Sequence, residues 1–278
     1  MQLELKSLSA RHPAAPSGSV ALKEATLALK AGEAVAIIGP SGSGKTTLLH
    51  AMACALRPAA GFYTLGQANP WALSGRELQR LRGQLALAPQ VPPLPPRQRV
   101  VTSVLAGALP HMGLWQSLRS LFYPSDLPAA HAALAQFDLA EKIFERVDRL
   151  SGGERQRVGL ARLLASHASL WLVDEPLSAL DPTRADQAIA SLVNNARQRG
   201  ATLVCSLHQV ERALASFPRV IGLREGAVAF DLPAQEVTPE ILKSLYAQHE
   251  HELFGPAPVN EFPEQLAAGA APAVMHCR

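Results

Sequence analysis

The sequence contains little cysteine, and its three cysteines form no recognisable pattern. Cys54, Cys205 and Cys277 are odd in number, and no pair has the CxxC spacing of a zinc ribbon or a redox motif. This argues against a disulfide framework and against a cysteine-based metal site. We therefore expect buried or chemically idle thiols in a reducing compartment.

Long apolar runs are also missing. A helix that crosses a bilayer needs roughly 18 to 20 apolar residues in succession, and no stretch of this sequence reaches that length. Residues 1–6 alternate between apolar and polar, and they lack the basic segment and apolar stretch of a secretory signal. We expect a protein that is not secreted and that, if it works at a membrane, lies on the membrane surface.

Charge is sparse and nearly balanced. The 278 residues include 26 Lys and Arg against 23 Asp and Glu, a net charge of +3, and no run of five or six like charges occurs. No nucleic-acid partner is therefore expected. A composition of 48% hydrophobic and 18% charged residues is typical of a globular protein. The length is compatible with one large α/β domain that carries an inserted lobe.

Short apolar runs of strand length alternate with helical stretches along the chain. We predict strands at residues 2–8, 25–29, 33–38, 169–173 and 202–207, helices at 47–52, 129–137 and 182–199, and a hairpin at 220–223 and 227–230. Turns are predicted at residues 13–19 and 123–126. Alternating strands and helices favour a parallel sheet with helices on its faces.

Proline and alanine indicate the boundaries. Residues 91–97 hold four prolines, so neither a helix nor a central strand can pass through them. Helical segments follow from about residue 100 to residue 148. We predict one domain over residues 1–250, with a helical lobe at about 91–165 inserted in it. Residues 251–278 are rich in Ala and Pro and are expected to form a loosely ordered tail.

A glycine-rich loop follows the strand predicted at residues 33–38. Residues 39–46 fit the pattern GxxxxGK[ST]. Backbone N–H groups of such a loop surround phosphate oxygens, and the start of the next helix adds a partial positive charge. Lys45 would reach the β- and γ-phosphates, and Thr46 would ligate Mg²⁺. The strand-loop-helix context disfavours a mere surface turn. The candidate nucleotide-binding residues are Gly39, Pro40, Ser41, Gly42, Ser43, Gly44, Lys45, Thr46 and Thr47.

An acidic pair, Asp174 and Glu175, follows the apolar run at residues 169–173. Parallel-sheet proteins bind ligands at the carboxyl ends of their strands, so the pair is expected beside the glycine-rich loop. Asp174 would hold Mg²⁺ through water, as the Walker B Asp does in P-loop NTPases. Glu175 would polarise the attacking water. A solvated acidic turn is the competing interpretation, which the preceding apolar run disfavours.

A second helix-start anion site is predicted at residues 150–157, which read LSGGERQR. Ser151, Gly152 and Gly153 offer a hydroxyl and free N–H groups to a phosphate. One chain with one glycine-rich phosphate loop has no second nucleotide to place there.

These motifs together resemble those of the ABC ATPase family, over roughly residues 1–250. The resemblance implies an α/β P-loop NTPase with a RecA-like parallel-sheet core, an N-terminal antiparallel β subdomain and an inserted α-helical lobe. It implies ATP and Mg²⁺ as ligands. It also implies a head-to-tail dimer in which Ser151 and Gly153 of one copy close over the γ-phosphate bound by Lys45 of the other.

The resemblance assigns three further residues. Gln90, in the run LAPQ, fits the glutamine that senses Mg²⁺ and the attacking water and hinges the helical lobe. Asp181 lies in the run SALD, which fits the D-loop at the dimer interface. His208 fits the switch histidine that contacts the γ-phosphate. A lone histidine is more often structural, but its position after a predicted strand favours the functional interpretation.

One position departs from the family pattern. Many ABC ATPases stack the adenine on an aromatic residue, usually Tyr, near residue 12, where this chain has His12. Imidazole can stack on a base, but it offers less area than a phenol ring and changes charge near neutral pH. A nucleotide-binding role and a role unrelated to the base remain open for His12.

Less general segments resemble the phosphonate importer ATPases. They are residues 104–109 (VLAGAL), 115–118 (WQSL), 120–122 (SLF), 207–214 (LHQVERAL) and 245–246 (LY). This resemblance implies phosphonate, or a related anion such as phosphite, as the cargo. The proline-dense stretch after Gln90 departs from that subfamily, and it lies where such an ATPase would meet the permease.

Two functions from different classes follow. The first is an importer ATPase bound peripherally to the cytoplasmic face of the inner membrane, with a second copy of itself and integral permease subunits as partners and a substrate-binding protein as an indirect one. The second is a soluble ABC-type ATPase of a metabolic or repair complex. The absence of tandem ABC domains and of a long coiled-coil insertion argues against it. A P-loop kinase would leave residues 150–157 and the acidic pair unexplained.

Overall fold

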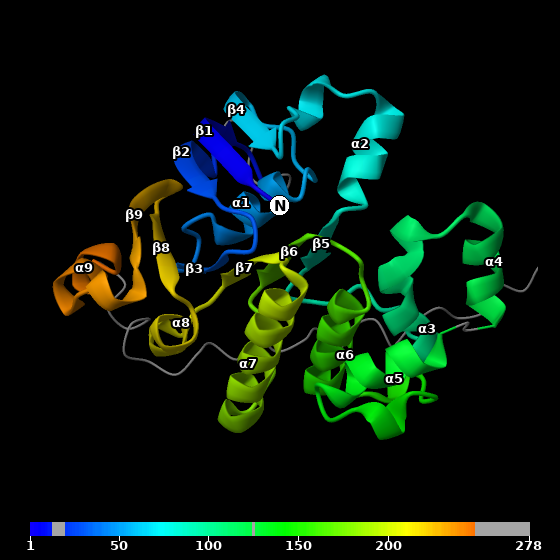
Figure 1. The fold of residues 1–278 in the computed structure, drawn as a ribbon. Helices are drawn as coiled ribbons and strands as arrows, with labels where there is room; N and C mark the ends of the chain where they lie inside the picture. Colours follow the sequence, from blue (N-terminus) through cyan, green and yellow to red (C-terminus); the bar gives the residue numbers. More distant parts are fainter. Residues whose placement is uncertain (13–19, 124–125, 248–278) are drawn as a thin grey trace, which may run out of the picture.

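The computed structural model describes residues 1–12, 20–123 and 126–247 (Figure 1). The predicted turn at residues 13–19, the centre of the turn at 123–126 and the predicted tail at 251–278 lie outside these residues. The strands are β1 (Leu3–Ala10), β2 (Leu22–Leu29), β3 (Ala34–Ile38), β4 (Ala60–Leu65), β5 (Leu85–Ala88), β6 (Leu170–Asp174), β7 (Thr202–Ser206), β8 (Arg219–Arg224) and β9 (Ala227–Pro233). The α-helices are α1 (Lys45–Met52), α2 (Gly75–Arg82), α3 (Val100–Leu105), α4 (Leu114–Phe122), α5 (Leu127–Ala135), α6 (Gly152–Leu164), α7 (Pro182–Arg199), α8 (Val210–Ser216) and α9 (Pro239–Leu245). Short 3-10 helices are η1 (Pro70–Ala72), η2 (Ala106–His111), η3 (Ala140–Lys142), η4 (Val147–Arg149) and η5 (Ala234–Glu236).

The larger sheet has the strand order β5-β6-β7-β3-β8-β9. All neighbouring pairs from β5 to β8 are parallel, and only β9 runs antiparallel, in a hairpin with β8. The carboxyl ends of β5, β6, β7 and β3 therefore meet along one edge of the sheet. That edge is where ligands bind in parallel α/β proteins.

The smaller sheet has the order β2-β1-β4 and is entirely antiparallel. It lies on one side of the larger sheet, with α1 close to both (Figure 1). This arrangement agrees with the predicted parallel core and N-terminal antiparallel subdomain.

The central strands are buried on both faces and divide their side chains between two cores. On β3, Val35 and Ile37 face the core shared with α1 and the small sheet, whereas Ala36 and Ile38 face the core shared with α6 and α7. Such strands are continuous apolar runs because helices or sheets cover both faces. This explains why residues 33–38, 169–173 and 202–207 are recognisable from the sequence.

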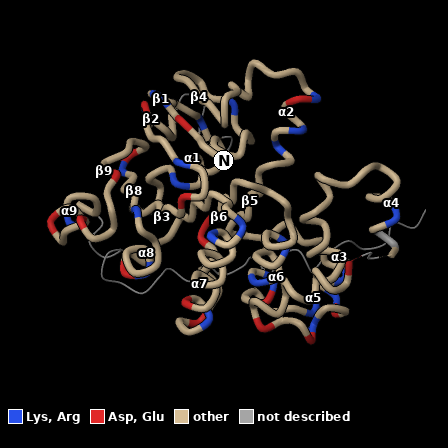
Figure 2. The backbone as a smooth tube through the Cα atoms, viewed as in Figure 1, with Lys and Arg blue, Asp and Glu red and all other residues tan. Residues whose placement is uncertain are grey.

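The helices α3, α5 and α6 pack against one another to form a helical lobe. Helix α4 lies at the outer side of this lobe (Figure 1). The segment before α3 is tied to the lobe by the backbone bond from Val147 N to Gln98 O at 3.0 Å. Lys and Arg alternate with Asp and Glu along much of the tube in Figure 2, but residues 78–123 carry arginines and no Asp or Glu. Among the described helices, none is both long and apolar enough to cross a membrane.

The predicted elements are found with shifted ends, and five others were missed. Strand β2 begins three residues before the predicted residue 25, and the helix predicted at 129–137 spans Leu127–Ala135. The elements β4, α2, β5, α8 and α9 are not among the predictions. Cys54 and Cys205 are buried free thiols, as expected, and Cys277 lies outside the described residues.

Candidate functional site

The glycine-rich loop connects the end of β3 to the start of α1. Gly39 has a φ of 151°, and a Cβ at this position would lie 2.0 Å from the carbonyl oxygen of Leu223 on β8. Only glycine therefore permits the loop to pass this close to the sheet. The loop is fixed to the β8–β9 turn by a bond from Gly226 N to Ser43 O at 3.0 Å.

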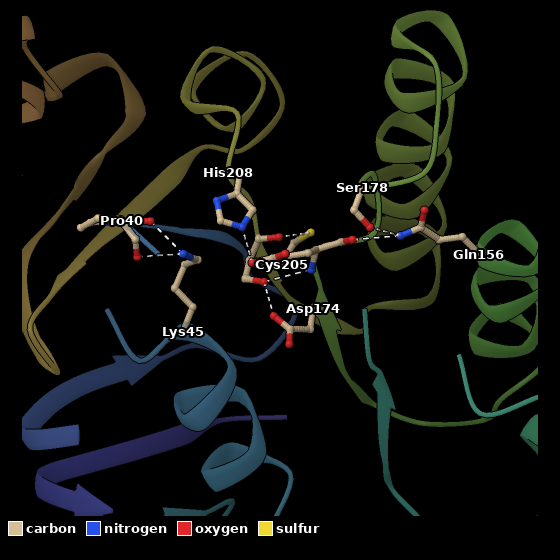
Figure 3. A network of polar contacts seen from close by, with 10 residues as sticks. Pro40, Lys45, Gln156, Asp174, Ser178, Cys205 and His208 are labelled. Atoms are coloured by element: carbon tan, nitrogen blue, oxygen red, sulfur yellow. Dashed lines mark hydrogen bonds and ion pairs between the residues drawn. The ribbon is translucent and has the colours of Figure 1, made fainter. Parts of the chain in front are cut away.

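Lys45 is the first residue of α1, and its side chain is only 5% exposed. Its ammonium group donates to the carbonyl oxygens of Gly39 at 2.8 Å and Pro40 at 3.2 Å (Figure 3). A buried ammonium group needs such acceptors to offset its lost hydration. The loop thus holds one concentrated positive charge at a helix N-terminus, an arrangement suited to binding phosphate.

A cavity of about 460 Å³ opens in front of this loop. Apart from Ala21, it gathers residues from distant parts of the chain that the sequence had singled out separately, whereas the predicted residues Gly39, Pro40 and Asp174 do not line it. Its lining consists of His12, Ala21, Ser41, Gly42, Ser43, Gly44, Lys45, Thr46, Thr47, Gln90, Glu175 and His208. Gln90 reaches it because β5 ends two residues earlier, at Ala88.

Asp174 is the last residue of β6 and is 3% exposed. One of its carboxylate oxygens, Oδ1, accepts a 2.6 Å hydrogen bond from the hydroxyl of Ser206 at the end of β7 (Figure 3). The pair arises because Asp174 and Ser206 are register partners in the parallel sheet. Ser206 therefore fixes the orientation of the carboxylate at the edge of the sheet.

Cys205 lies beside this acidic group on β7. Burial raises the pKa of its thiol, and the negative charge of Asp174 raises it further. The thiol therefore stays neutral and behaves as a small apolar side chain.

Glu175 has a φ of 46°, which is uncommon for a residue other than glycine. Its backbone N–H is held by the hydroxyl of Ser206 at 3.0 Å and by the carbonyl oxygen of the same residue at 3.2 Å. The turn directs its carboxylate into the cavity, where Oε1 lies 2.5 Å from Nε2 of His208. These two side chains are 12% and 21% exposed, so both can reach a bound molecule.

Ser151, Gly152 and Gly153 do not line the cavity, and neither does Asp181. Ser151 caps the N-terminus of α6, and Asp181 caps that of α7 by accepting from Arg184 N at 3.0 Å. Gly153 lies against the segment before α7, since a Cβ on it would be 2.6 Å from the carbonyl oxygen of Ala179. These residues form a second group, separate from the glycine-rich loop of the same chain.

Gln156, on α6, connects the helical lobe to this edge of the sheet. Its side-chain nitrogen donates to the Glu175 carbonyl at 2.9 Å and the Ser178 hydroxyl at 3.2 Å, and its oxygen accepts from Ala179 N at 3.0 Å (Figure 3). The residue is 2% exposed. One amide therefore joins the helix that Ser151 caps to the backbone of Glu175.

Sequence reasoning missed Gln156 and Ser206. Ser206 had a weak signal, a hydroxyl at the end of a strongly apolar strand. Gln156 had a polar side chain within an apolar-periodic helix. Neither signal specifies a partner, because the partners are 19 to 32 residues away in the sequence.

Replacing Gln156 with alanine is expected to destabilise the junction between lobe and core. The change leaves the partly buried N–H of Ala179 and carbonyl of Glu175 without this partner, at a cost of about 1–3 kcal/mol in the free energy of unfolding. Urea denaturation measures the loss. The matched control is Gln79→Ala on the exposed face of α2, where a change below about 0.5 kcal/mol is expected. Equal stability of the two variants would contradict this role.

Comparison with known proteins gives the family. The family profile described as ABC transporter matches residues 22–178. The chain is 66% identical to the Phosphonates import ATP-binding protein PhnC of Polaromonas sp. (strain JS666), with 100% of both chains covered. It is 50% identical to Phosphonates import ATP-binding protein PhnC 1 of Pseudomonas aeruginosa, with 99% of this chain and 98% of that one covered.

A solved structure has the same fold. The dimeric structure of MJ0796, described as a bacterial ABC transporter cassette, superposes with a TM-score of 0.72 at 26% identity. The match covers 84% of this chain and 100% of that one. The predicted fold class is therefore confirmed. The chain belongs to the ABC transporter family, and its fold is that of the ATP-binding cassette.

Proposed function

We propose that this chain is the ATP-hydrolysing subunit of an ABC importer for phosphonates or a closely related phosphorus oxyanion. The observation that carries the ATPase role is the cavity that unites the glycine-rich loop with Gln90, Glu175 and His208. The cargo is supported by similarity over the full length to proteins named as phosphonate import ATP-binding proteins.

The loop residues bind the phosphates of ATP in this proposal. Backbone N–H groups of residues 41–44 and the N-terminus of α1 face the phosphate oxygens, and Lys45 exchanges its loop carbonyls for the β- and γ-phosphates. His12 lies at the wall of the same cavity, where its ring can contact the base.

The oxygen-rich lining suits Mg²⁺. Thr46 and Gln90 of this lining supply a hydroxyl and an amide oxygen, and Asp174, which ends β6 next to Glu175 but does not itself line the cavity, supplies a carboxylate. All three are hard donors of the type that Mg²⁺ prefers. Among the described residues, no cluster of three or more His, Cys, Asp or Glu side chains forms a dedicated metal cage. Few protein ligands are expected, because Mg²⁺ at phosphates keeps several waters. When bound, Mg²⁺ would neutralise charge on the β- and γ-phosphates.

Glu175 and His208 act on the hydrolysis step. The carboxylate of Glu175 orients the attacking water and accepts its proton, and His208 donates a hydrogen bond to the γ-phosphate. Their present contact at 2.5 Å holds the two groups near one another before the nucleotide arrives. Ser206 keeps the backbone of Glu175 in the turn that this geometry needs.

A second copy of the chain completes the site. Ser151, Gly152 and Gly153 lie at a helix start outside the cavity of their own chain, so they can serve a nucleotide held by a partner. Asp181 lies beside them and would cross the interface. The similar cassette MJ0796 is described as dimeric, and one of its structures holds ADP and Pi.

The importer role places the dimer against integral permease subunits at the cytoplasmic face of the membrane, with a substrate-binding protein delivering cargo from the other side. Closure of the dimer on ATP would drive the permease between its two orientations, and hydrolysis would reopen it. This location and these partners are supported by the names of the similar proteins.

Uptake in cells tests the proposal. A strain that lacks the gene is expected to lose at least about 90% of its ATP-dependent uptake of a radiolabelled alkylphosphonate, because without the ATPase no closure of the transporter occurs. The parent gene should restore uptake, and Lys45→Ala should not. Phosphite and an unrelated solute serve as comparison cargoes. Undiminished phosphonate uptake in the deletion strain, or purification of the chain only with soluble enzymes, would contradict the importer role.

A further inference from the structure

The start of α6 carries a negative charge of its own. Glu154, the third residue of the helix, directs its carboxylate back to Ser151, where Oε2 accepts from the backbone N–H at 2.8 Å. In return the hydroxyl of Ser151 accepts from the N–H of Glu154 at 3.3 Å. This reciprocal capping box stabilises the helix start. It also puts a carboxylate at the place where the proposed function requires a phosphate to bind.

The carboxylate is ionised at neutral pH. Its side chain is 18% exposed, and burial alone would raise its pKa, but the hydrogen bonds from Lys142 and Ser151 outweigh burial and lower the pKa from 4.5 to about 2. A full negative charge is therefore present whenever the protein is at physiological pH.

Lys142 lies on η3 of the helical lobe, and its ammonium group contacts Oε1 of Glu154. Its own side chain is 31% exposed, so the pair is at the edge of the surface rather than in the core. Exposed pairs contribute little to stability, so a purely stabilising role gives little reason for a charged pair here. A glutamine at position 154 would cap the helix equally well without any charge.

The electrostatic consequence is larger than the structural one. A nucleotide γ-phosphate that approaches the same helix start would be repelled by the unneutralised carboxylate there, which lies within hydrogen-bond distance of the Ser151 N–H. The helix N-terminus alone offers only about half a positive charge to offset that repulsion. Lys142 removes this conflict because it balances the carboxylate from the side of the lobe.

We propose that Lys142 is a positioning residue that neutralises Glu154 and so keeps the start of α6 able to bind the γ-phosphate of a nucleotide held by a second copy of the chain. This inference rests on the proposed function, since it needs the two-copy site. If Lys142 neutralises Glu154 in this way, the charge balance of this ion pair affects how tightly two copies of the chain associate in ATP.

The test compares three variants in a Glu175→Gln background, where slow hydrolysis leaves ATP bound. Lys142→Met is expected to weaken the ATP-dependent dimer roughly tenfold, the scale of one unbalanced charge at this distance. Glu154→Gln should leave the dimer as strong as in the parent or stronger, because the capping box survives and the lysine is then uncompensated. The double change Lys142→Met with Glu154→Gln should return the affinity to within about twofold of the parent. Sedimentation velocity over a range of protein concentrations measures each dimer.

The double variant separates charge balance from a simple tether. A tether between η3 and α6 would be broken in all three variants, so equal weakening of all three would overturn the proposal. Lys142→Arg, which keeps the charge, should bind like the parent, and Lys243→Met on the exposed face of α9 is the control for loss of a lysine. Circular dichroism and ATP binding by the monomer show that each variant is folded.

Ser151→Ala distinguishes this inference from the proposed function. If Ser151→Ala weakens the dimer but Lys142→Met does not, only the inference about Lys142 is wrong. If the parent forms no dimer with ATP, the two-copy site of the proposed function is wrong as well.

Discussion

Changing Glu175 to glutamine is expected to lower the rate of ATP hydrolysis by about 10²- to 10⁴-fold, the range for loss of a positioned general base. Glutamine has almost the same shape, and the Glu175 backbone stays fixed by Ser206, so the turn with a φ of 46° is retained. What is lost is the negative charge that accepts the proton of the attacking water. The rate of phosphate release from ATP by the purified chain measures the effect.

The same variant should bind ATP at least as tightly as the parent. Removing a carboxylate beside the γ-phosphate removes a repulsion, and the slower reaction keeps ATP in place. We therefore expect a dimer that persists in ATP and dissociates in ADP, detectable by size-exclusion chromatography.

Glu225→Gln provides a closely matched control. This substitution makes the same chemical change at a residue that also has a positive φ, 49°. The side chain of Glu225, however, is 73% exposed in the turn between β8 and β9. Its hydrolysis rate should stay within twofold of the parent rate. Hydrolysis by the Glu175 variant at the parent rate would show that another group activates the water.

The parts of the fold that could be predicted are those with a strong local pattern. The strands β3, β6 and β7 are covered on both faces, so each is a continuous apolar run of strand length. Helix α7 has Asp181 at its start and Gly200 at its end, and both signals are visible in the sequence.

The stretch from β4 to β5 lacks such a pattern, and this explains three of the five missed elements. The first three residues of β4 are exposed, and β5 reads LALA, with two alanines and no β-branched residue. Helix α2 has no fully buried residue, and its apolar stripe consists of only Leu78 and Leu81, which pack against the core. The strands β4 and β5 form because β1 and β6 supply hydrogen bonds that a local pattern does not reveal, whereas α2 begins at the capping box of Ser74 and Glu77.

The site divides in the same way. The glycine-rich loop, Asp174 with Glu175, and Ser151 with its glycines are each continuous in the sequence, so their chemistry can be predicted from spacing. Their assembly cannot be, because it depends on strand order. The register of β6 against β7 brings Ser206 to Asp174, and the packing of α6 brings Gln156 to Glu175. Tertiary structure alone determines these contacts.

Lys45→Ala is expected to weaken ATP binding roughly 100-fold, the scale of loss when one member of a buried charged pair is removed. Lys45 is 5% exposed, and its ammonium group donates to the carbonyls of Gly39 and Pro40, so it lies where phosphate oxygens can replace them. No other lysine or arginine lines the cavity among the described residues. Isothermal titration calorimetry with ATP and Mg²⁺ measures the dissociation constant.

A loss of ATP binding must be distinguished from a loss of folding, because the hydrogen bonds of Lys45 to Gly39 and Pro40 also stabilise the loop. Lys45→Met keeps the aliphatic stem that packs in the loop, and it should lose ATP binding as Lys45→Ala does while its thermal unfolding stays within a few degrees of the parent. Lys243→Ala, an exposed lysine on α9, should bind ATP normally. A dissociation constant within twofold of the parent for Lys45→Met would mean that the helix N-terminus and the loop N–H groups bind the phosphates without the lysine. Because the helix start carries only about half a charge against the several charges of ATP, we expect the lysine to be indispensable.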